Sequence, residues 1–111
     1  MFLGRYNSAS TIKLDSLVKE PINFLKMDIE GAEVDAILGG INILRKSHAE
    51  CAICSYHNTG EAEYIKFLLE KLGYATETSQ GYIFFIYDPK MEYTMDFRRG
   101  IVYGTKKLNK K

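Results

Sequence analysis

Three acidic residues follow an apolar segment of the chain at a point where chemistry could take place. Asp28 ends the segment 22–28, and Glu30 and Glu33 come directly after it, at the start of a helical pattern. A strand that runs into a helix places such acids at its carboxyl end, the edge where ligands bind in open α/β sheets. The acids could simply match the helix dipole, worth about 0.3–1 kcal/mol each. The functional alternative makes Asp28 catalytic and gives Glu30 and Glu33 a role toward the substrate or the helix N-terminus.

A histidine and an asparagine follow a second apolar segment, 51–56. If both segments are parallel strands, His57 and Asn58 lie beside Asp28 at one edge of the sheet. Oxygen donors and an imidazole can bind a divalent cation, so Asp28, His57 and Asn58 form a candidate metal site. His57 could instead be a catalytic general base toward a hydroxyl, since the ordinary pKa of histidine lies near neutrality. The third interpretation is a solvated loop histidine.

Two histidines and two cysteines recur at a spacing of three, in the order His48, Cys51, Cys54 and His57. The C-x-x-C spacing is common in zinc and redox sites. This segment is expected to be a strand, however, and residues three apart in a strand point to opposite faces. The sequence therefore favours buried cysteines over a zinc or redox site. The many aromatic residues of the expected strands are likewise interpreted mainly as core.

Hydrophobic periodicity predicts the elements that position these side chains. Helices that separate the first main strands imply parallel pairing, and consecutive strands near the end imply an antiparallel hairpin. Asp15 is expected to cap a short helical turn at 15–19. Glycines 39 and 40 interrupt a helical pattern and indicate close packing or a kink. Strands are expected over 11–14, 22–28, 51–56, 74–78, 82–87 and 97–103, and helices over 32–46 and 61–72.

Composition indicates one α/β domain of an ordinary intracellular protein. The chain has 111 residues, a net charge of +1 and 46% hydrophobic residues. Balanced charge gives no reason to expect nucleic acid as a partner, and no apolar run is long enough for a membrane span. Without a secretory signal, we expect a cytoplasmic location. The expected organisation is an irregular leader over 1–10, a domain over 11–105 and a basic tail over 106–111, which we expect to fray.

One motif resembles a known family. The sequence KMDIEGAE at 26–33 resembles the K-x-D-x-E-G-x-E signature of the FkbM-type, S-adenosylmethionine-dependent methyltransferases, and LDSL at 14–17 resembles an L-D-x-L element that precedes it. The family also has a glycine near Gly40, which favours close packing there. The resemblance implies a Rossmann-like methyltransferase sheet, S-adenosylmethionine as cofactor and methyl transfer to a hydroxyl of a small molecule or sugar.

The glycine-rich G-x-G turn that holds the cofactor in this class has no counterpart in the chain. We therefore expect a partial Rossmann-like sheet that lacks its first strands and corresponds to the carboxyl-terminal half of the family's domain. The strand 22–28 would lie at an exposed edge unless residues 11–14, a second chain or a homo-oligomer covers it. Two functions follow: part of a methyltransferase, or a truncated non-catalytic domain that acts through association.

Overall fold

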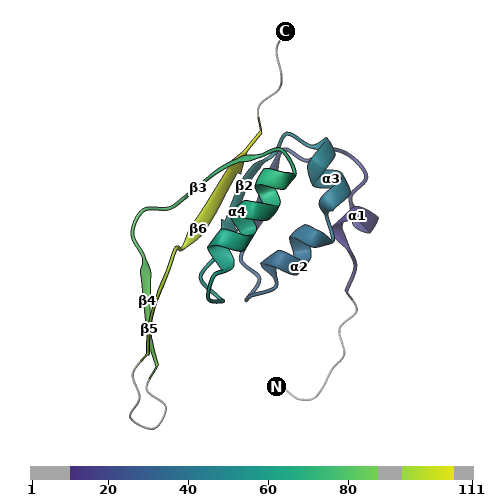
Figure 1. Ribbon diagram of the computed structural model, residues 1–111. Helices are drawn as coiled ribbons and strands as arrows, with labels where there is room; N and C mark the ends of the chain where they lie inside the picture. The colour runs from purple at the N-terminus through teal and green to yellow at the C-terminus, as the bar shows by residue number, and fades with distance from the viewer. Residues whose placement is uncertain (1–10, 88–93, 107–111) are drawn as a thin grey trace.

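A computed structural model describes residues 11–87 and 94–106 (Figure 1). The expected leader at 1–10, the break after residue 87 and most of the basic tail lie outside the described residues. In chain order the elements are α1 (Leu14–Leu17), β1 (Phe24–Met27), α2 (Glu33–Leu38), α3 (Ile41–Lys46), β2 (Glu50–Cys54), α4 (Glu61–Lys71), β3 (Ala75–Thr78), β4 (Ile83–Tyr87), β5 (Thr94–Arg98) and β6 (Ile101–Thr105).

The strands form a mixed four-stranded sheet in the order β1-β2-β6-β3 and a separate β4–β5 hairpin. β1 and β2 are parallel, with Met27 opposite Ile53, and β6 is antiparallel to both β2 and β3. The mixed α/β fold with an antiparallel carboxyl-terminal hairpin is thus confirmed. The single strand expected over 97–103 is wrong: the chain changes sheets at Arg99 and Gly100, so β5 belongs to the hairpin and β6 to the main sheet.

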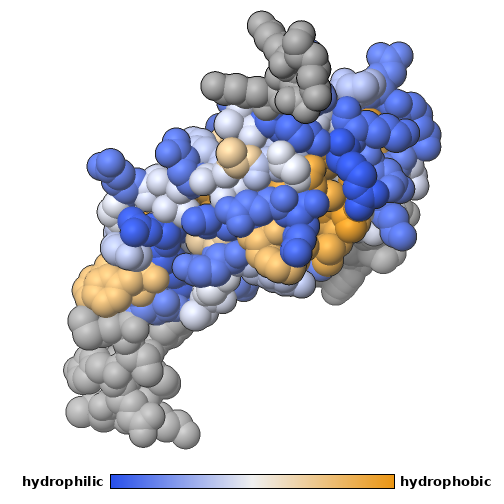
Figure 2. Space-filling model, turned by 45° about the horizontal axis from the view of Figure 1, so that its top comes forward, coloured by the Kyte–Doolittle hydropathy of each residue, from blue (hydrophilic) through white to orange (hydrophobic). Residues whose placement is uncertain are grey.

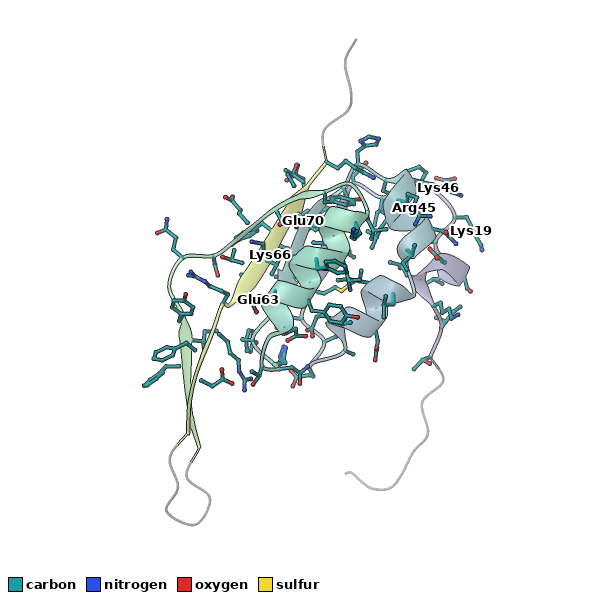
Figure 3. The ribbon with its side chains drawn as sticks, in the orientation of Figure 1. Lys19, Arg45, Lys46, Glu63, Lys66 and Glu70 are labelled. Atoms are coloured by element: carbon teal, nitrogen blue, oxygen red, sulfur yellow. The ribbon has the colours of Figure 1, made fainter. Side chains whose placement is uncertain are left out.

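The helices pack on one face of the main sheet, and the core lies between the two layers (Figure 1). Side chains that alternate along the strands supply one half, and the buried stripes of the helices supply the other. The outward face of α4 carries Glu63, Lys66 and Glu70 (Figure 3). The buried side chains that form the centre of the core are Met27, Ile37, Leu44, Ile53, Ile65, Leu69 and Val102.

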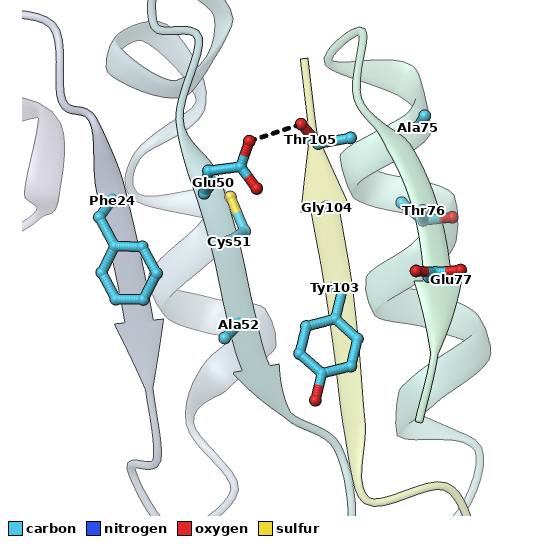
Figure 4. A pocket seen from close by; sticks show the side chains of 10 residues that line it. All are labelled: Phe24, Glu50, Cys51, Ala52, Ala75, Thr76, Glu77, Tyr103, Gly104 and Thr105. Carbon is cyan, nitrogen blue, oxygen red and sulfur yellow. Dashed lines mark hydrogen bonds between the residues drawn. The ribbon is translucent and has the colours of Figure 1, made fainter. Parts of the chain in front are cut away.

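The opposite face of the sheet is open. Phe24 is 62% exposed and Lys26 is exposed, whereas Leu25 and Met27 pack toward the helices. β1 is therefore buried on one face only, because no described element covers its second face. Figure 4 shows the resulting hollow of about 600 Å³, which is lined by all four strands. As expected, β1 lies at the edge of the sheet.

The helix expected over 32–46 is two helices, α2 and α3, with Gly39 and Gly40 between them. A Cβ at Gly40 would lie 2.8 Å from a side-chain carbon of Leu14, so the glycine pair allows α1 to pack closely. Both the kink and the close packing are thus present. Leu14 begins α1, so the strand expected over 11–14 does not form.

Asp15 caps a different helix from the one expected. Lys13, not Asp15, is the N-cap of α1. The Asp15 carboxylate instead accepts the N–H groups of Asn42 (3.0 Å) and Ile43 (2.8 Å) at the start of α3. Exposed N–H groups of a helix start favour a carboxylate. They outweigh burial, which alone would raise the pKa of Asp15, and hold that pKa below its usual value.

Lys106, the first residue of the expected basic tail, does not fray. Its ammonium group donates to the carbonyl oxygens of Arg45 (2.8 Å), Leu72 (3.1 Å) and Leu44 (3.4 Å). These carbonyls lie where α3 and α4 end, and a cation is favourable at that end of a helix. Lys106 therefore ties the last strand to two helices.

The β4–β5 hairpin carries aromatic side chains that are exposed rather than part of the core. Phe84 stacks on Phe97 at 4.7 Å between ring centroids, and the Tyr82 ring packs edge-on against Phe97. Figure 2 shows a hydrophobic patch beside the grey tip of the hairpin. The expectation of core aromatics is wrong for these three residues. In the described part of the chain, no helix is long and apolar enough to cross a membrane.

Candidate active site

The turn between β1 and α2 is shaped by a buried glutamate. Glu30 and Gly31 adopt positive φ angles of 61° and 98°, which reverse the chain after the strand. Glu33, at the start of α2, is fully buried and folds back onto this turn. Its carboxylate accepts the N–H groups of Ile29 (2.7 Å) and Gly31 (3.0 Å). Glu33 is therefore a structural centre of the turn and not a solvated helix acid.

The turn between β2 and α4 is built in the same way. Glu61 begins α4, and its Oε1 atom accepts the N–H groups of His57 and Asn58, each at 3.1 Å. The Asn58 side chain donates to the carbonyl oxygen of Gly31 (3.2 Å). A Cβ at Gly31 would lie 3.1 Å from that amide nitrogen, so the glycine leaves the space that Asn58 fills. The two turns are thus joined at the carboxyl ends of β1 and β2.

The imidazole of His57 lies between acids from both turns. Its Nδ1 atom is 3.3 Å from Oε2 of Glu33, and its Nε2 atom is 3.5 Å from Oδ1 of Asp28 and 3.8 Å from Oε2 of Glu30. The His57 side chain is 13% exposed, Glu33 is buried, and Asp28 and Glu30 face solvent. One nitrogen of the ring therefore faces the interior and the other faces the open edge of the sheet.

The pKa values of Glu33 and Glu61 shift in opposite directions. Burial alone would raise the pKa of Glu33, but the Ile29 N–H and a hydrogen bond from Glu61 outweigh it and lower that pKa. Burial, together with the hydrogen bond to Glu33, raises the pKa of Glu61. The buried Oε2 atom of Glu61 accepts no hydrogen bond. Of the two acids, Glu61 therefore keeps its proton to higher pH, and Glu33 is the more readily ionised.

Asp28 has two further neighbours on β2 and in the loop after it. The Tyr56 hydroxyl donates to Oδ1 of Asp28 at 3.4 Å, and the negative charge of Asp28 is the main cause that raises the pKa of Tyr56. Burial, and then the same carboxylate, raises the pKa of Cys54. Both groups stay protonated near neutral pH and face a carboxylate. Asp28 is thus an acceptor at the rim of the site.

The cysteines of β2 do not share a site. Both are free, and Cys51 is buried under the helices whereas Cys54 lies half-buried on the opposite side of the strand. Burial raises the pKa of Cys51 to about 11, so this thiol is a core group rather than a nucleophile. This agrees with the expectation of buried cysteines for Cys51.

A group that could hold a cation consists of Asp28, Glu33 and His57, with one ligand atom from each within 4.8 Å of the others. The acids, however, lie at different ring nitrogens, Glu33 at Nδ1 and Asp28 at Nε2. An ion binds only one of these nitrogens. Asn58, the third ligand expected from the sequence, uses its amide nitrogen to hold Gly31. The arrangement favours a carboxylate–imidazole–carboxylate chain over a single shared ion.

Most of the chain matches one known protein family. A family model described as the methyltransferase FkbM domain matches residues 2–84. The chain belongs to the FkbM methyltransferase family. The crystal structure of methyltransferase FkbM from Methylobacillus flagellatus KT is similar, with a TM-score of 0.54 and 18% identity. That match covers 82% of this chain and 22% of the other, so the chain spans about a fifth of its structural relative. No curated protein matches.

Three residues of the motif at 26–33 have a physical task in this FkbM-type site. Asp28 faces the open edge, Gly31 makes room for Asn58, and Glu33 holds the turn and faces His57. The sequence predicted that Asp28 and His57 lie side by side, as they do, but gave Glu33 only a minor role and did not indicate Glu61. The spacing Asn58-x-x-Glu61 is that of a capping box, which could have indicated Glu61.

Proposed function

We propose that this chain forms the acceptor-side half of a methyltransferase that transfers a methyl group from S-adenosylmethionine to a hydroxyl of a small molecule or sugar. Membership of the FkbM family supports the reaction class. The observation that carries the proposal is the position of His57, with Nδ1 beside buried Glu33 and Nε2 beside exposed Asp28. A histidine held in this way is suited to take a proton from a hydroxyl at the open edge.

The proposed base works through an oriented tautomer. The Glu33 carboxylate favours a proton on the nearby Nδ1 atom of His57, which leaves a lone pair on Nε2. A hydroxyl at the open edge would give its proton to Nε2, which would make the hydroxyl oxygen a better nucleophile. The resulting imidazolium lies between Glu33 and Asp28, whose charges stabilise it. Glu33 is therefore a positioning residue, and Asp28 and His57 are the groups that would meet the acceptor.

The described residues do not fit the cofactor. A S-adenosylmethionine site needs a turn whose free backbone N–H groups and missing side chains let the ligand approach. Here Glu33 and Glu61 occupy the N–H groups of both β→α turns, and Asn58 fills the space above Gly31. We therefore propose that another segment holds the cofactor and that the described residues of this chain act only on the acceptor.

The first test is isothermal titration of S-adenosylmethionine into the chain. We expect no heat of binding. Micromolar affinity would contradict the proposal that the cofactor is held elsewhere. A companion assay mixes the chain with a G-x-G-bearing FkbM-type segment and a panel of hydroxyl acceptors, and measures S-adenosylhomocysteine. Asp28→Ala should abolish that product without changing the unfolding temperature. Product formation by this variant would mean that Asp28 only matches the helix dipole.

A divalent cation at Asp28, Glu33 and His57 is the competing use of the same residues. It is tested by equilibrium dialysis of the chain against Mg²⁺ and Mn²⁺, with His57→Ala as the matched variant. The orientation of His57 between two acids predicts that neither ion is retained. Retention by the parent chain and loss in His57→Ala would replace the general base with a metal-assisted mechanism.

The unpaired edge of β1 favours a second candidate, a non-catalytic domain that acts through association. Among the described strands, β1 pairs with β2 alone, and a groove of about 510 Å³ lies beside its other edge. The groove is lined in part by Ile12, Leu17 and Leu25. An apolar strand edge of this kind favours an added β-strand. Because the chain spans 22% of its structural relative, we propose a strand from the rest of an FkbM-type protein as the occupant.

Sedimentation velocity distinguishes the possible occupants of the β1 edge. A chain that remains monomeric, with rapid hydrogen exchange at the outward amides of β1, is expected. Adding the complementary FkbM-type segment should slow that exchange. A concentration-dependent dimer with protected β1 amides would instead make a second copy of this chain the occupant.

A further inference from the structure

The peptide group that carries His57 is held from two sides. Its N–H, that of His57, donates to Oε1 of Glu61 in α4 (3.1 Å). Its C=O, that of Tyr56, accepts from Nη1 of Arg98 in β5 (2.7 Å). A peptide plane fixed at both its donor and its acceptor cannot rotate without breaking one of these hydrogen bonds. The orientation of His57 therefore depends on the hairpin as well as on α4.

Arg98 reaches the loop as one member of a small polar cluster. Its Nε and Nη2 atoms contact Oδ2 of Asp96, at 2.9 and 2.8 Å. The same Asp96 oxygen accepts the Thr59 hydroxyl (2.6 Å). Tyr56 and Thr59 flank His57 in the sequence. Asp96 and Arg98 consequently hold the loop on both sides of the histidine.

The alternation of β5 explains why this strand can grip the loop. Asp96 and Arg98 point to the face that meets the loop, whereas Phe97 between them is exposed and stacks on Phe84. Arg98 is 8% exposed, and a guanidinium so buried requires charge and hydrogen-bond partners. The Thr59 hydroxyl and then Arg98 hold the pKa of Asp96 below its usual value, so the ion pair persists at neutral pH.

The His57 ring lies against the Tyr56 ring, at 4.2 Å between ring centroids, and between Glu33 and Asp28. Its Nδ1 atom is buried beside Glu33 without a well-aligned hydrogen bond. The backbone must therefore supply the orientation that the side chain lacks. We propose that Asp96 and Arg98 are positioning residues that keep Nδ1 of His57 facing Glu33, and so maintain its tautomer, by fixing the Tyr56–His57 peptide group. This inference rests on the proposed role of His57 as a general base.

The test compares Arg98→Lys with Arg99→Lys. Lysine keeps the charge but loses the planar fork that contacts Tyr56 and Asp96 together. Arg99 is the matched control, because it is the adjacent arginine and holds Ser79 and Gly81 instead of the loop. The measurement is ¹⁵N–¹H correlation of the histidine ring nitrogens at about pH 9, where a histidine of ordinary pKa is neutral.

We expect the parent chain and Arg99→Lys to show His57 as a single Nδ1–H tautomer, and Arg98→Lys to show averaged nitrogens. Exposed His48 should be unchanged in all three proteins. Identical His57 spectra in the two lysine variants would overturn the inference. If Arg98→Lys does not fold, Asp96→Asn provides the same comparison. An Nε2–H tautomer in the parent chain would contradict the general base, yet a change confined to Arg98→Lys would still support positioning.

Discussion

The two β→α turns of this protein use the same device, with glutamates whose pKa values shift in opposite directions. In each, the first residue of the helix is a glutamate that folds back and accepts two backbone N–H groups of the turn. Glu33 divides these N–H groups between its two oxygens, whereas Glu61 accepts both at Oε1 and leaves Oε2 buried without a donor. Burial and then the hydrogen bond to Glu33 raise the pKa of Glu61, whereas the Ile29 N–H and Glu61 outweigh burial and lower the pKa of Glu33.

The difference shows how a buried pair of acids avoids two charges. Two adjacent carboxylates repel each other, and desolvation makes each charge costly. The acid whose two oxygens both accept N–H groups is the more readily ionised, and the other keeps its proton to higher pH. His57 then faces the charged member of the pair. The uneven distribution of N–H groups thus decides which turn presents a negative charge to the imidazole.

The largest effect is expected from Glu33→Ala. This change leaves the N–H groups of Ile29 and Gly31 without their acceptor and removes the carboxylate that is hydrogen-bonded to Glu61. We expect a loss of about 3–5 kcal/mol in the free energy of unfolding, measured by urea denaturation. Glu63→Ala, on the outer face of α4, is the control and should change it by less than about 0.5 kcal/mol. Equal losses in both variants would show that Glu33 does not organise the turn.

The sequence predicted the part of the site that follows from strand direction. Parallel strands bring their carboxyl ends together, so Asp28 and His57 could be placed side by side without coordinates. It did not predict that Glu33 is buried, because the pattern of one helix cannot show that a neighbouring turn closes over an acid. Glu61 lies three positions after Asn58 in an ordinary capping pattern, and both the burial and the Glu33 side chain that raise its pKa come from contacts with another part of the chain.

An intermediate loss in the free energy of unfolding is expected when the glycines of the two turns are replaced. Gly31 and Gly60 both have positive φ angles, of 98° and 75°. A Cβ at Gly31 meets the Asn58 amide at 3.1 Å, whereas nothing lies within 4 Å of a Cβ at Gly60. Gly60→Ala should cost about 1 kcal/mol from backbone strain alone, and Gly31→Ala about 2–3 kcal/mol. Chemical denaturation of both variants measures the difference, and equal costs would show that Asn58 does not pack tightly on the first turn.

The sequence predicted the helices and strands that depend on local periodicity. The prediction failed where a contact with a distant segment determines the structure. The parallel strands and α4 were predicted from periodicity. The long helix over 32–46 failed because Leu14 packs against Gly40, a contact between segments far apart in the chain. The prediction that Asp15 caps its own helix was wrong for a similar reason. The exposed N–H groups at the start of α3 lie within reach of its carboxylate. Tertiary contacts thus overrode local capping preference.

Of these substitutions, Glu61→Gln is expected to change the free energy of unfolding least at acidic pH. The glutamine oxygen can accept the His57 and Asn58 N–H groups, and its amide can donate to Glu33 as the neutral acid does. Near pH 4 we expect the free energy of unfolding to change by less than about 1 kcal/mol. Glu61→Ala removes both functions and should cost about 2–3 kcal/mol in the same measurement. A glutamine variant as unstable as the alanine variant would mean that Glu61 is not the donor of the pair.

The pH dependence of the same variant decides the protonation states. Because the folded pKa of Glu61 is raised above its ordinary value of 4.5, its stabilising effect is complete below pH 4.5 and is lost as pH rises through the folded pKa. Glu33, with a lowered pKa, stabilises above 4.5 and loses that effect as pH falls, and it is present in both proteins. Glu61→Gln should therefore gain stability relative to the parent above pH 4.5, by at most about 1.4 kcal/mol per pH unit. Parallel stability curves from pH 4 to 8 would mean that folding does not raise the pKa of Glu61, and the two turns would then not differ in charge.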